Sequence, residues 1–158
     1  MLIPARLDWY KLVPAAYKVM AGLEGVVRSS GLDPLLLDLV RMRASQINGC
    51  AYCLDMHSKD ARAAGETEQR LYALNAWRET PFYTDRERAA LAWTEAVTLI
   101  GEGHAPDDVY DELRKHFTDE EVVSLTLAIV SINGWNRLAI GFRAEPGSYQ
   151  PAGTRRSG

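Results

Sequence analysis

The stretch INGCAYCLDMH, residues 47–57, contains both cysteines of the 158-residue chain, spaced C-x-x-C, and a histidine four positions after the second cysteine. An Asn-Gly turn comes before the cysteines, and a run of good helix formers follows them. If a helix begins near Cys50, then Cys50, Cys53 and His57 share one face, because positions three and four apart are neighbours on a helix. The stretch therefore predicts a helix that begins at one thiol and carries a second thiol and an imidazole beside it.

Helical signals continue on both sides of this stretch. Before it, the spacing of apolar residues predicts helices over residues 14–31 and 34–47, the second opened by the pair Asp33-Pro34. Strand alternation appears nowhere, so we predict an all-α bundle of about six to seven helices. After the cysteines, glycine and proline stops and two capping boxes predict helices over residues 50–64, 67–81, 84–100, 106–117 and 118–142.

The two ends of the chain are predicted to differ from this bundle. Residues 1–12 carry apolar and aromatic side chains without a clean period, so we expect an extended arm whose aromatic residues pack on the body or on another subunit. Residues 144–158 are rich in proline and glycine and are expected to be disordered. The folded domain is therefore expected to span residues 1–143, with residues 1–12 as its N-terminal arm.

The most apolar stretch is residues 122–142, which carries no charged residue before Arg137. A helix that is apolar on nearly all sides lies at the centre of a protein or at an oligomer interface. The triplet Ile-Asn-Gly of residues 47–49 also recurs inside this stretch, at residues 132–134. The repeat is too short to establish a duplication, but it is compatible with one.

Several polar and aromatic residues are expected to have structural roles. Arg41 and Arg43 are expected to lie away from the inward face of their helix, and Glu95 on a solvated or interface face. Three tryptophans are expected to be core or interface anchors rather than parts of a cofactor site: Trp77, Trp93 and Trp135.

The formal net charge of −3 and a pI of about 5.6 provide no basic field for nucleic acid or an anionic membrane. Charged residues and a proline interrupt the apolar N-terminus, so no secretion signal is expected. No apolar run approaches the roughly 18 residues of a membrane span. We therefore expect a cytoplasmic protein, in which a C-x-x-C pair is reduced and reactive rather than a structural staple.

Such a dithiol is suited to redox catalysis. Backbone N–H groups and the helix dipole stabilise a thiolate at a helix N-terminus. When a peroxide oxidises one thiolate to a sulfenic acid, a second thiol within reach condenses with it to a disulfide and releases water. His57 lies one turn after Cys53 and can hold or relay a proton, which favours Cys53 over Cys50 as the attacking thiolate.

Two other interpretations of the cysteines stay open. Cys50, Cys53 and His57 supply three ligands of a zinc site, which would need His104 or His116 as the fourth, although neither belongs to a second ligand pair. Both cysteines could instead be small buried hydrophobic residues, although the Asn-Gly turn places them at a helix start rather than in mid-core. We predict no bound metal and no cofactor.

Residues 38–65, which contain the motif, resemble the AhpD-like alkylhydroperoxidases of the carboxymuconolactone decarboxylase superfamily, as do residues 84–98 and 132–142. The resemblance covers most of residues 15–143. It implies an all-helical subunit of a homo-oligomer, commonly a trimer or hexamer. It also implies a thiol peroxidase that needs no haem or flavin and takes its electrons from a protein dithiol or a lipoyl group.

The same resemblance implies roles for individual residues. Cys53 corresponds to the peroxidatic thiol, Cys50 to the resolving thiol and His57 to a member of the proton relay. The acidic relay residue of the family, usually Glu, stands twelve positions before the first cysteine, where this chain has the shorter Asp38. Tyr52 takes the place of a second histidine found in the best-studied type, so one titratable group is missing here.

The sequence therefore predicts a cytoplasmic, oligomeric, all-α thiol peroxidase that reduces hydroperoxides through Cys53 and Cys50. The alternative is a helical oligomer that senses oxidants or binds a metal without turnover. Steady-state peroxide consumption with a thiol reductant separates the two, because a sensor would oxidise once and stop.

Overall fold

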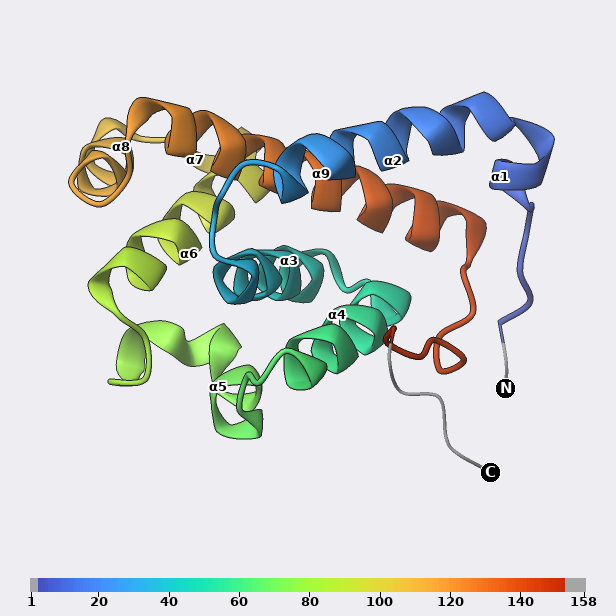
Figure 1. The fold of residues 1–158 in the computed structure, drawn as a ribbon, viewed down its shortest axis with the longest axis horizontal. Helices are drawn as coiled ribbons and strands as arrows, with labels where there is room; N and C mark the ends of the chain where they lie inside the picture. Colours follow the sequence, from blue (N-terminus) through green and yellow to red (C-terminus); the bar gives the residue numbers. More distant parts are fainter. Residues whose placement is uncertain (1–2, 153–158) are drawn as a thin grey trace.

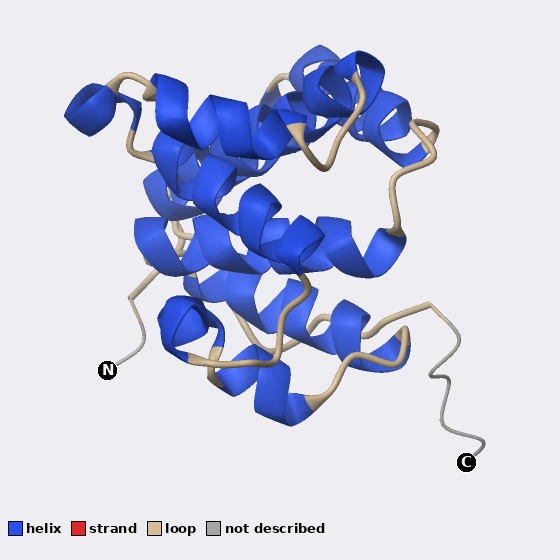
Figure 2. Ribbon diagram, turned by 90° about the vertical axis from the view of Figure 1, so that its left-hand side faces the viewer, coloured by secondary structure: helices blue, strands red, loops and turns tan. Residues whose placement is uncertain are grey.

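Every regular element in residues 3–152, the part of the chain that the computed structural model describes, is a helix (Figures 1 and 2). The all-α prediction is therefore confirmed for this part of the chain. In chain order the helices are α1 (Trp9–Leu12), α2 (Pro14–Arg28), α3 (Pro34–Asn48), α4 (Ala51–Ala63), α5 (Glu68–Tyr72), the 3₁₀ helix η1 (Leu74–Glu79), α6 (Asp85–Thr98), α7 (Ile100–Gly103), α8 (Asp107–Arg114) and α9 (Asp119–Phe142).

Each predicted helical segment contains a helix, with three differences in detail. The segment 67–81 divides into α5 and η1, and the backbone of Ala76 inside η1 departs from helical geometry. α6 ends at Thr98, and the short helix α7 follows it. The N-terminal arm is not wholly extended, because α1 forms where backbone N–H groups of Lys11 and Leu12 bond to the carbonyl of Asp8.

α3 lies at the centre of the fold, where it contacts α4, α6 and α9 (Figure 1). The carboxylate of Asp33 caps its start by accepting a hydrogen bond from the backbone N–H of Leu35 at 3.0 Å, and Pro34 occupies the first turn. Because helices cover it on several sides, α3 buries residues around most of its circumference, including the fully enclosed Leu39 and Val40.

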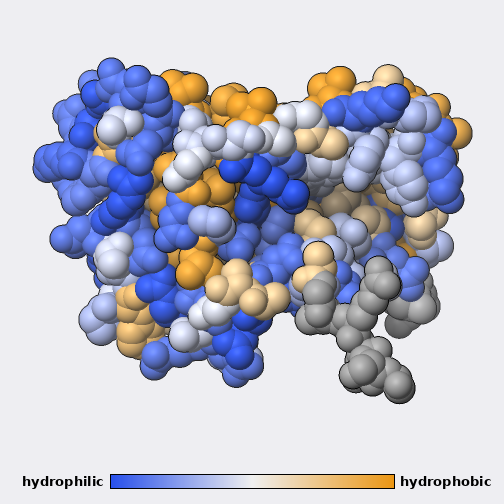
Figure 3. All heavy atoms as spheres, in the orientation of Figure 1, coloured by the Kyte–Doolittle hydropathy of each residue, from blue (hydrophilic) through white to orange (hydrophobic). Residues whose placement is uncertain are grey.

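α9 is the long apolar helix, and it packs against both α2 and α3. The predicted capping box is present at its start, formed by Thr118 and Glu121. Its inner side chains, such as Ile129, are buried, whereas Val123 and Val130 are exposed. Apolar surface is visible along the upper edge of the molecule in Figure 3, where α9 and α2 run in Figure 1. Among residues 3–152 this helix alone is long and apolar enough, by length and composition, to span a membrane, which a core helix can also be; it packs against α2 and α3.

Two charged residues expected on outer faces are largely buried instead. Arg43 donates a hydrogen bond through Nε to Glu95 Oε1 at 2.9 Å, and Trp77 donates through Nε1 to the same oxygen at 2.8 Å. The side chains of Arg43 and Glu95 are only 16% and 15% exposed. The expectation was wrong because the two partners come from different helices, and spacing within one helix does not reveal such a pair.

The C-terminal segment also differs from expectation, since residues 145–152 lie along α4 although they form no helix. The backbone N–H of Gly147 donates to Asp55 at 3.1 Å, and Lys59 Nζ donates to the carbonyl oxygens of Gly147 and Tyr149. The proline- and glycine-rich composition of the segment predicted disorder. It does not reveal these contacts, because their partners are surface residues of α4, far away in the sequence. The rest of the predicted tail, residues 153–158, lies outside the described residues.

The central position of α3 predicts a large effect of truncating Leu39, which is completely buried. Leu39→Ala is expected to lower the free energy of unfolding by about 2–5 kcal/mol, because it removes buried methyl groups and leaves a cavity. Leu12→Ala, at a side chain that is 64% exposed, is the matched control and should change stability by no more than about 0.5 kcal/mol. Urea unfolding measures both, and equal effects would contradict the central placement of α3.

Candidate active site

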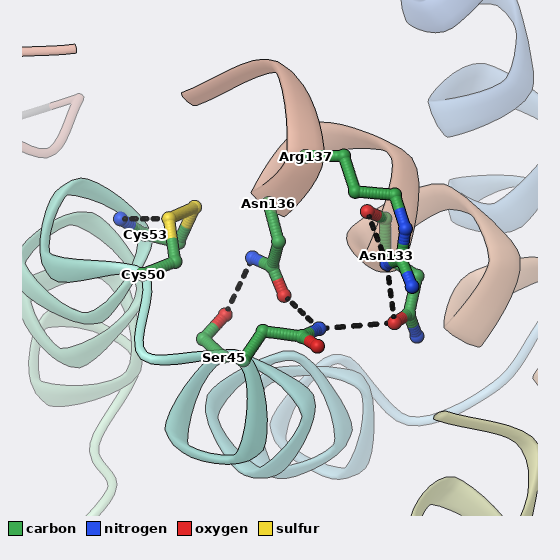
Figure 4. The surroundings of a disulfide bond; sticks show 7 residues. Ser45, Cys50, Cys53, Asn133, Asn136 and Arg137 are labelled. Atoms are coloured by element: carbon green, nitrogen blue, oxygen red, sulfur yellow. Dashed lines mark hydrogen bonds between the residues drawn. A yellow bond between two sulfur atoms is a disulfide. The ribbon is translucent and has the colours of Figure 1, made fainter. Parts of the chain in front are cut away.

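The two cysteines form a disulfide, with Cα atoms 5.3 Å apart (Figure 4). Cys50 is the N-cap of α4, and its sulfur accepts a hydrogen bond from the backbone N–H of Cys53 at 3.3 Å. Both side chains are 1% exposed. The predicted position of the pair at a helix start is confirmed, with the first cysteine one residue before the helix.

Gly49 joins α3 to α4 in a turn of left-handed geometry, with φ +69° and ψ 35°. Glycine adopts this conformation without the steric strain that a Cβ atom causes. The backbone N–H of Cys50 closes the turn by donating to the carbonyl of Ser45 at 3.0 Å. Since the turn is so short, side chains in the first half of α3 and in the first turns of α4 face the same space.

That space is a cavity of about 720 Å³ lined by residues of α1, α2, α3, α4 and α9. Cys53 and His57 of α4 line it together with Asp38 of α3, whereas Cys50 is not part of its wall. Tyr52, which replaces the second histidine, lines it too. The structure thus brings three of the four predicted site residues to one cavity, and the fourth is covalently joined to Cys53. A cavity of this volume accommodates a small organic ligand.

A buried charge cluster extends the site on the side of α3. Arg41 lies 3.3 Å from Asp38 and donates to Glu24 of α2 at 3.0 Å. The second carboxylate oxygen of Glu24 accepts a hydrogen bond from Ser131 of α9 at 2.6 Å. Asp38, Arg41 and Glu24 all line the cavity.

Glu24 was not predicted from the sequence, and Arg41 was expected on an outer face, whereas it is only 8% exposed. Its correct position depends on two carboxylates, one on its own helix and one on α2. Two signals could have pointed to the cluster. Asp38 and Arg41 stand at the i, i+3 spacing of a helical ion pair, and Glu24 interrupts the apolar run that ends with Val27.

Burial gives Asp38 and His57 unusual protonation behaviour. Burial is the main cause that raises the pKa of Asp38 to about 6, and the positive charge of Arg41 partly opposes it. Burial, together with the nearby charges of Arg41 and Arg28, lowers the pKa of His57 to about 3. At neutral pH the imidazole is therefore uncharged, and Asp38 is the group that exchanges protons most readily.

A network of amides backs the cysteine turn from α9 (Figure 4). Asn48 donates through Nδ2 to the side-chain oxygens of Asn133 at 2.9 Å and Asn136 at 2.8 Å. Asn136, which is fully buried, donates in turn to Ser45 at 3.0 Å. The two Ile-Asn-Gly triplets of the sequence therefore meet in space, and their asparagines fix the end of α3 against α9.

The C-terminal segment contributes Tyr149 to the cavity wall, and Ala144, just before the segment, lines the cavity too. The hydroxyl of Tyr149 donates to Asp60 of α4 at 2.6 Å, and burial is the main cause that raises its pKa to about 12. Tyr149 therefore stays a hydrogen-bond donor at neutral pH. Trp135 also lines the cavity, whereas Trp77 and Trp93 are buried in the core as expected.

The residues considered as a fourth zinc ligand do not complete a metal site. Within residues 3–152, no three or more His, Cys, Asp and Glu side chains are grouped so that they could hold a metal ion. His116 lies instead 3.2 Å from Glu112 on α8. The two cysteines are bonded to each other in a disulfide.

The opposite pKa shifts predict how the stability of the oxidised protein responds to acid. The native pKa of Asp38, about 6, lies above its unfolded value of about 3.9, so its protonation stabilises the fold as the pH falls from about 6 to about 4. The native pKa of His57, about 3, lies below its unfolded value of about 6.5, so the fold loses stability as the pH falls from about 6.5 to about 3.

We expect Asp38→Asn to make the acid loss of unfolding free energy between about pH 6 and pH 4 steeper than in the wild type, because only the His57 effect remains. His57→Gln should make it shallower for the converse reason. Urea unfolding at a series of pH values measures both slopes. Slopes that move in the same direction in the two variants would contradict these protonation states.

Comparisons with known proteins bear on the family. The profile of the Carboxymuconolactone decarboxylase family matches residues 14–96. The uncharacterized protein YdfG of Bacillus subtilis is 44% identical over 135 residues, which are 85% of this chain and 92% of YdfG. The uncharacterized protein YnjA of Escherichia coli is 30% identical over 135 residues, 82% of this chain and 70% of YnjA.

Two crystal structures show the same fold. A protein of unknown function from Agrobacterium tumefaciens, assigned provisionally as the antioxidant defence protein AhpD, is 48% identical with a TM-score of 0.89, covering 92% of this chain and 100% of its own. The debrominase Bmp8 is similar in fold, with 22% identity and a TM-score of 0.76 over 85% of this chain and 73% of its own. The chain therefore belongs to the carboxymuconolactone decarboxylase family, and its helices have the AhpD-like arrangement.

Proposed function

We propose that this protein is a thiol peroxidase of the cytoplasm that reduces organic hydroperoxides through Cys53 and Cys50. One observation carries the proposal: Cys53 lines a cavity together with Asp38 and His57, and its disulfide partner Cys50 lies behind it. The family membership supports the same class of activity, as does the 48% identity with a provisionally assigned antioxidant defence protein.

The reaction starts from the reduced dithiol. The Cys53 thiolate attacks one oxygen of the hydroperoxide, so that an S–O bond forms, the O–O bond breaks and the alcohol leaves after it takes up a proton. The thiolate of Cys50 then attacks the sulfur of the resulting sulfenic acid. The S–S bond forms, and hydroxide leaves as water with a second proton. A protein dithiol or a dihydrolipoyl group restores both thiols by exchange and is itself oxidised to a disulfide.

The cavity supports the choice of Cys53 as the attacking thiol. A substrate in the cavity meets Cys53, which is in its wall, before it can meet Cys50, which is not. Cys50, as the N-cap, has its sulfur beside the backbone N–H of Cys53, and this donor would stabilise its thiolate for the second step. Each cysteine thus has the surroundings that its step requires.

His57 and Asp38 would divide the proton transfers between them. A neutral imidazole accepts a proton at one nitrogen while it donates at the other, so His57 can relay a proton without becoming an imidazolium ion, which its pKa of about 3 disfavours. Asp38, whose pKa is raised to about 6, is the better final acceptor of the thiol proton and the better donor to the leaving alkoxide. Its shorter side chain leaves room for a bridging water.

We also propose a homo-oligomer, as the family resemblance implied. Exposed apolar residues occur on both α2 and α9, two helices that pack against each other, and they favour association because burying them would remove apolar surface from water. They are Val19, Val26, Val123 and Val130.

The two cysteines are expected to give different single variants. Cys53→Ser should abolish peroxide consumption, because no thiol remains in the cavity wall. Cys50→Ser should consume one equivalent of peroxide per active site and stop with a sulfenic acid on Cys53, which dimedone labelling and mass spectrometry detect. Cumene hydroperoxide with dihydrolipoamide as reductant provides the assay.

Two results would contradict the proposal. A wild type that oxidises once and does not turn over with any dithiol would be a redox sensor. If Cys50→Ser were inert and Cys53→Ser formed the sulfenic acid, the roles of the two thiols would be reversed.

Removing the relay should slow the peroxide step without abolishing it. His57→Gln retains a polar side chain but cannot relay a proton, so the second-order rate constant for oxidation of the dithiol should fall by about 10²- to 10⁴-fold. Stopped-flow tryptophan fluorescence measures that rate constant. His116→Gln is the matched control and should retain the wild-type value, and an equally fast His57→Gln would exclude a role for this imidazole.

A further inference from the structure

Arg28 lies in the last turn of α2 and lines the cavity, yet it is exposed and makes no ion pair within residues 3–152. Arg41, the other arginine of the cavity, is by contrast held by both Asp38 and Glu24. Arg28 lines the cavity together with His57 and Asp38, and its charge contributes to lowering the pKa of each of these two groups. Arg28 is therefore a cation available to a bound molecule.

The carboxylates of the cavity already have donors. Glu24 accepts hydrogen bonds from Arg41 and Ser131, and Asp60 accepts one from Tyr149. Asp38 faces Arg41 at 3.3 Å. Since each of these acids is engaged by a residue of the protein itself, they compete less for Arg28 than unpaired carboxylates would. A guanidinium with free donors binds a carboxylate through two parallel hydrogen bonds.

Another part of the cavity wall is aromatic. Trp135 of α9 packs against Trp9 of α1 and Tyr17 of α2, with ring centroids 6.0 Å apart in both pairs. Trp9 and Tyr17 also face each other at 6.3 Å. All three rings line the cavity and form what we name the aromatic wall. Flat aromatic surfaces of this kind bind apolar or aromatic groups.

We propose that the cavity selects hydroperoxides whose aromatic or apolar body carries a carboxylate, with the carboxylate bound by Arg28 and the body packed on the aromatic wall. The selection of a hydroperoxide rests on the proposed function, whereas the selection of an aromatic acid does not. In the bound molecule the O–O bond reaches Cys53 and is cleaved as proposed above. The carboxylate is bound but is neither oxidised nor reduced.

The kinetic test compares two hydroperoxides that differ only in charge: cumene hydroperoxide and its para-carboxylate. With wild type, kcat/KM for the carboxylate should exceed that for the neutral compound by about tenfold, the factor expected for a charge-assisted hydrogen bond in a partly exposed site. Arg28→Gln should bring the ratio to about one, and Arg28→Lys should restore part of it. The preference should also weaken at high salt.

Lys18→Gln is the matched control, because it removes an exposed positive charge from the same helix outside the cavity. It should retain the wild-type ratio. A ratio near one in wild type, or one that is unchanged in Arg28→Gln, would overturn the inference and leave the proposed peroxidase intact. The ratio is the informative quantity, because the charge of Arg28 also acts on Asp38 and His57 and can alter both rates together.

A binding experiment without peroxide separates this inference from the proposed function. Quenching of tryptophan fluorescence by 4-isopropylbenzoate should reveal binding through Trp9 and Trp135. Arg28→Gln should bind this acid about tenfold more weakly than wild type does. Wild type should bind the neutral 4-isopropylbenzamide about tenfold more weakly than the acid. Binding of the acid by a protein that turns over no hydroperoxide would support the cavity assignment and exclude the peroxidase. Equal binding of acid and amide would overturn the assignment whatever the activity.

Discussion

The left-handed turn at Gly49 is the constraint on which the site depends. It reverses the chain in one residue between α3 and α4, so that Asp38 near the start of one helix and His57 on the other face a common cavity. The same turn leaves Cys50 at the N-cap of α4, beside the backbone N–H of Cys53. A longer or differently twisted connection would separate the acid from the thiols.

The charged cluster beside the thiols shows how a helical core accommodates charge. Burying an arginine costs several kcal/mol of desolvation unless partners compensate it, and roughly as much again for each carboxylate. Arg41 has two carboxylate partners, and the one on α2 is further held by Ser131 of α9. The arrangement ties three helices together around the cavity. It also leaves Asp38 only partly compensated, which is why its proton is exchangeable near neutral pH.

The parts of the molecule that surround the cavity divide into two groups. The side chains proposed to react stand on α3 and α4, which are held in the core by α9 and by its asparagine contacts with the cysteine turn. Much of the remaining wall comes from α1, α2 and the C-terminal segment near Tyr149. The debrominase Bmp8 has a similar fold at 22% identity, and a shared fold does not by itself fix what a cavity binds.

Local sequence by itself determined the helices and the position of the thiols. Apolar spacing, capping boxes and glycine stops act within a few residues of where they occur, so they predicted the helices other than the short α1 and α7 and placed Cys50, Cys53 and His57 at a helix start. The resemblance to AhpD-like proteins added Asp38, which spacing on the helix could not connect to the cysteines.

The tertiary structure decided what those residues face. Arg41, Arg43 and Glu95 were misplaced and Glu24 was missed because each has an ion-pair partner on another helix. The C-terminal segment was expected to be disordered because its composition carries no sign of its contacts with α4. Burial, cavities and ion pairs are sums over residues distant in the chain, and only the packed helices bring those residues together.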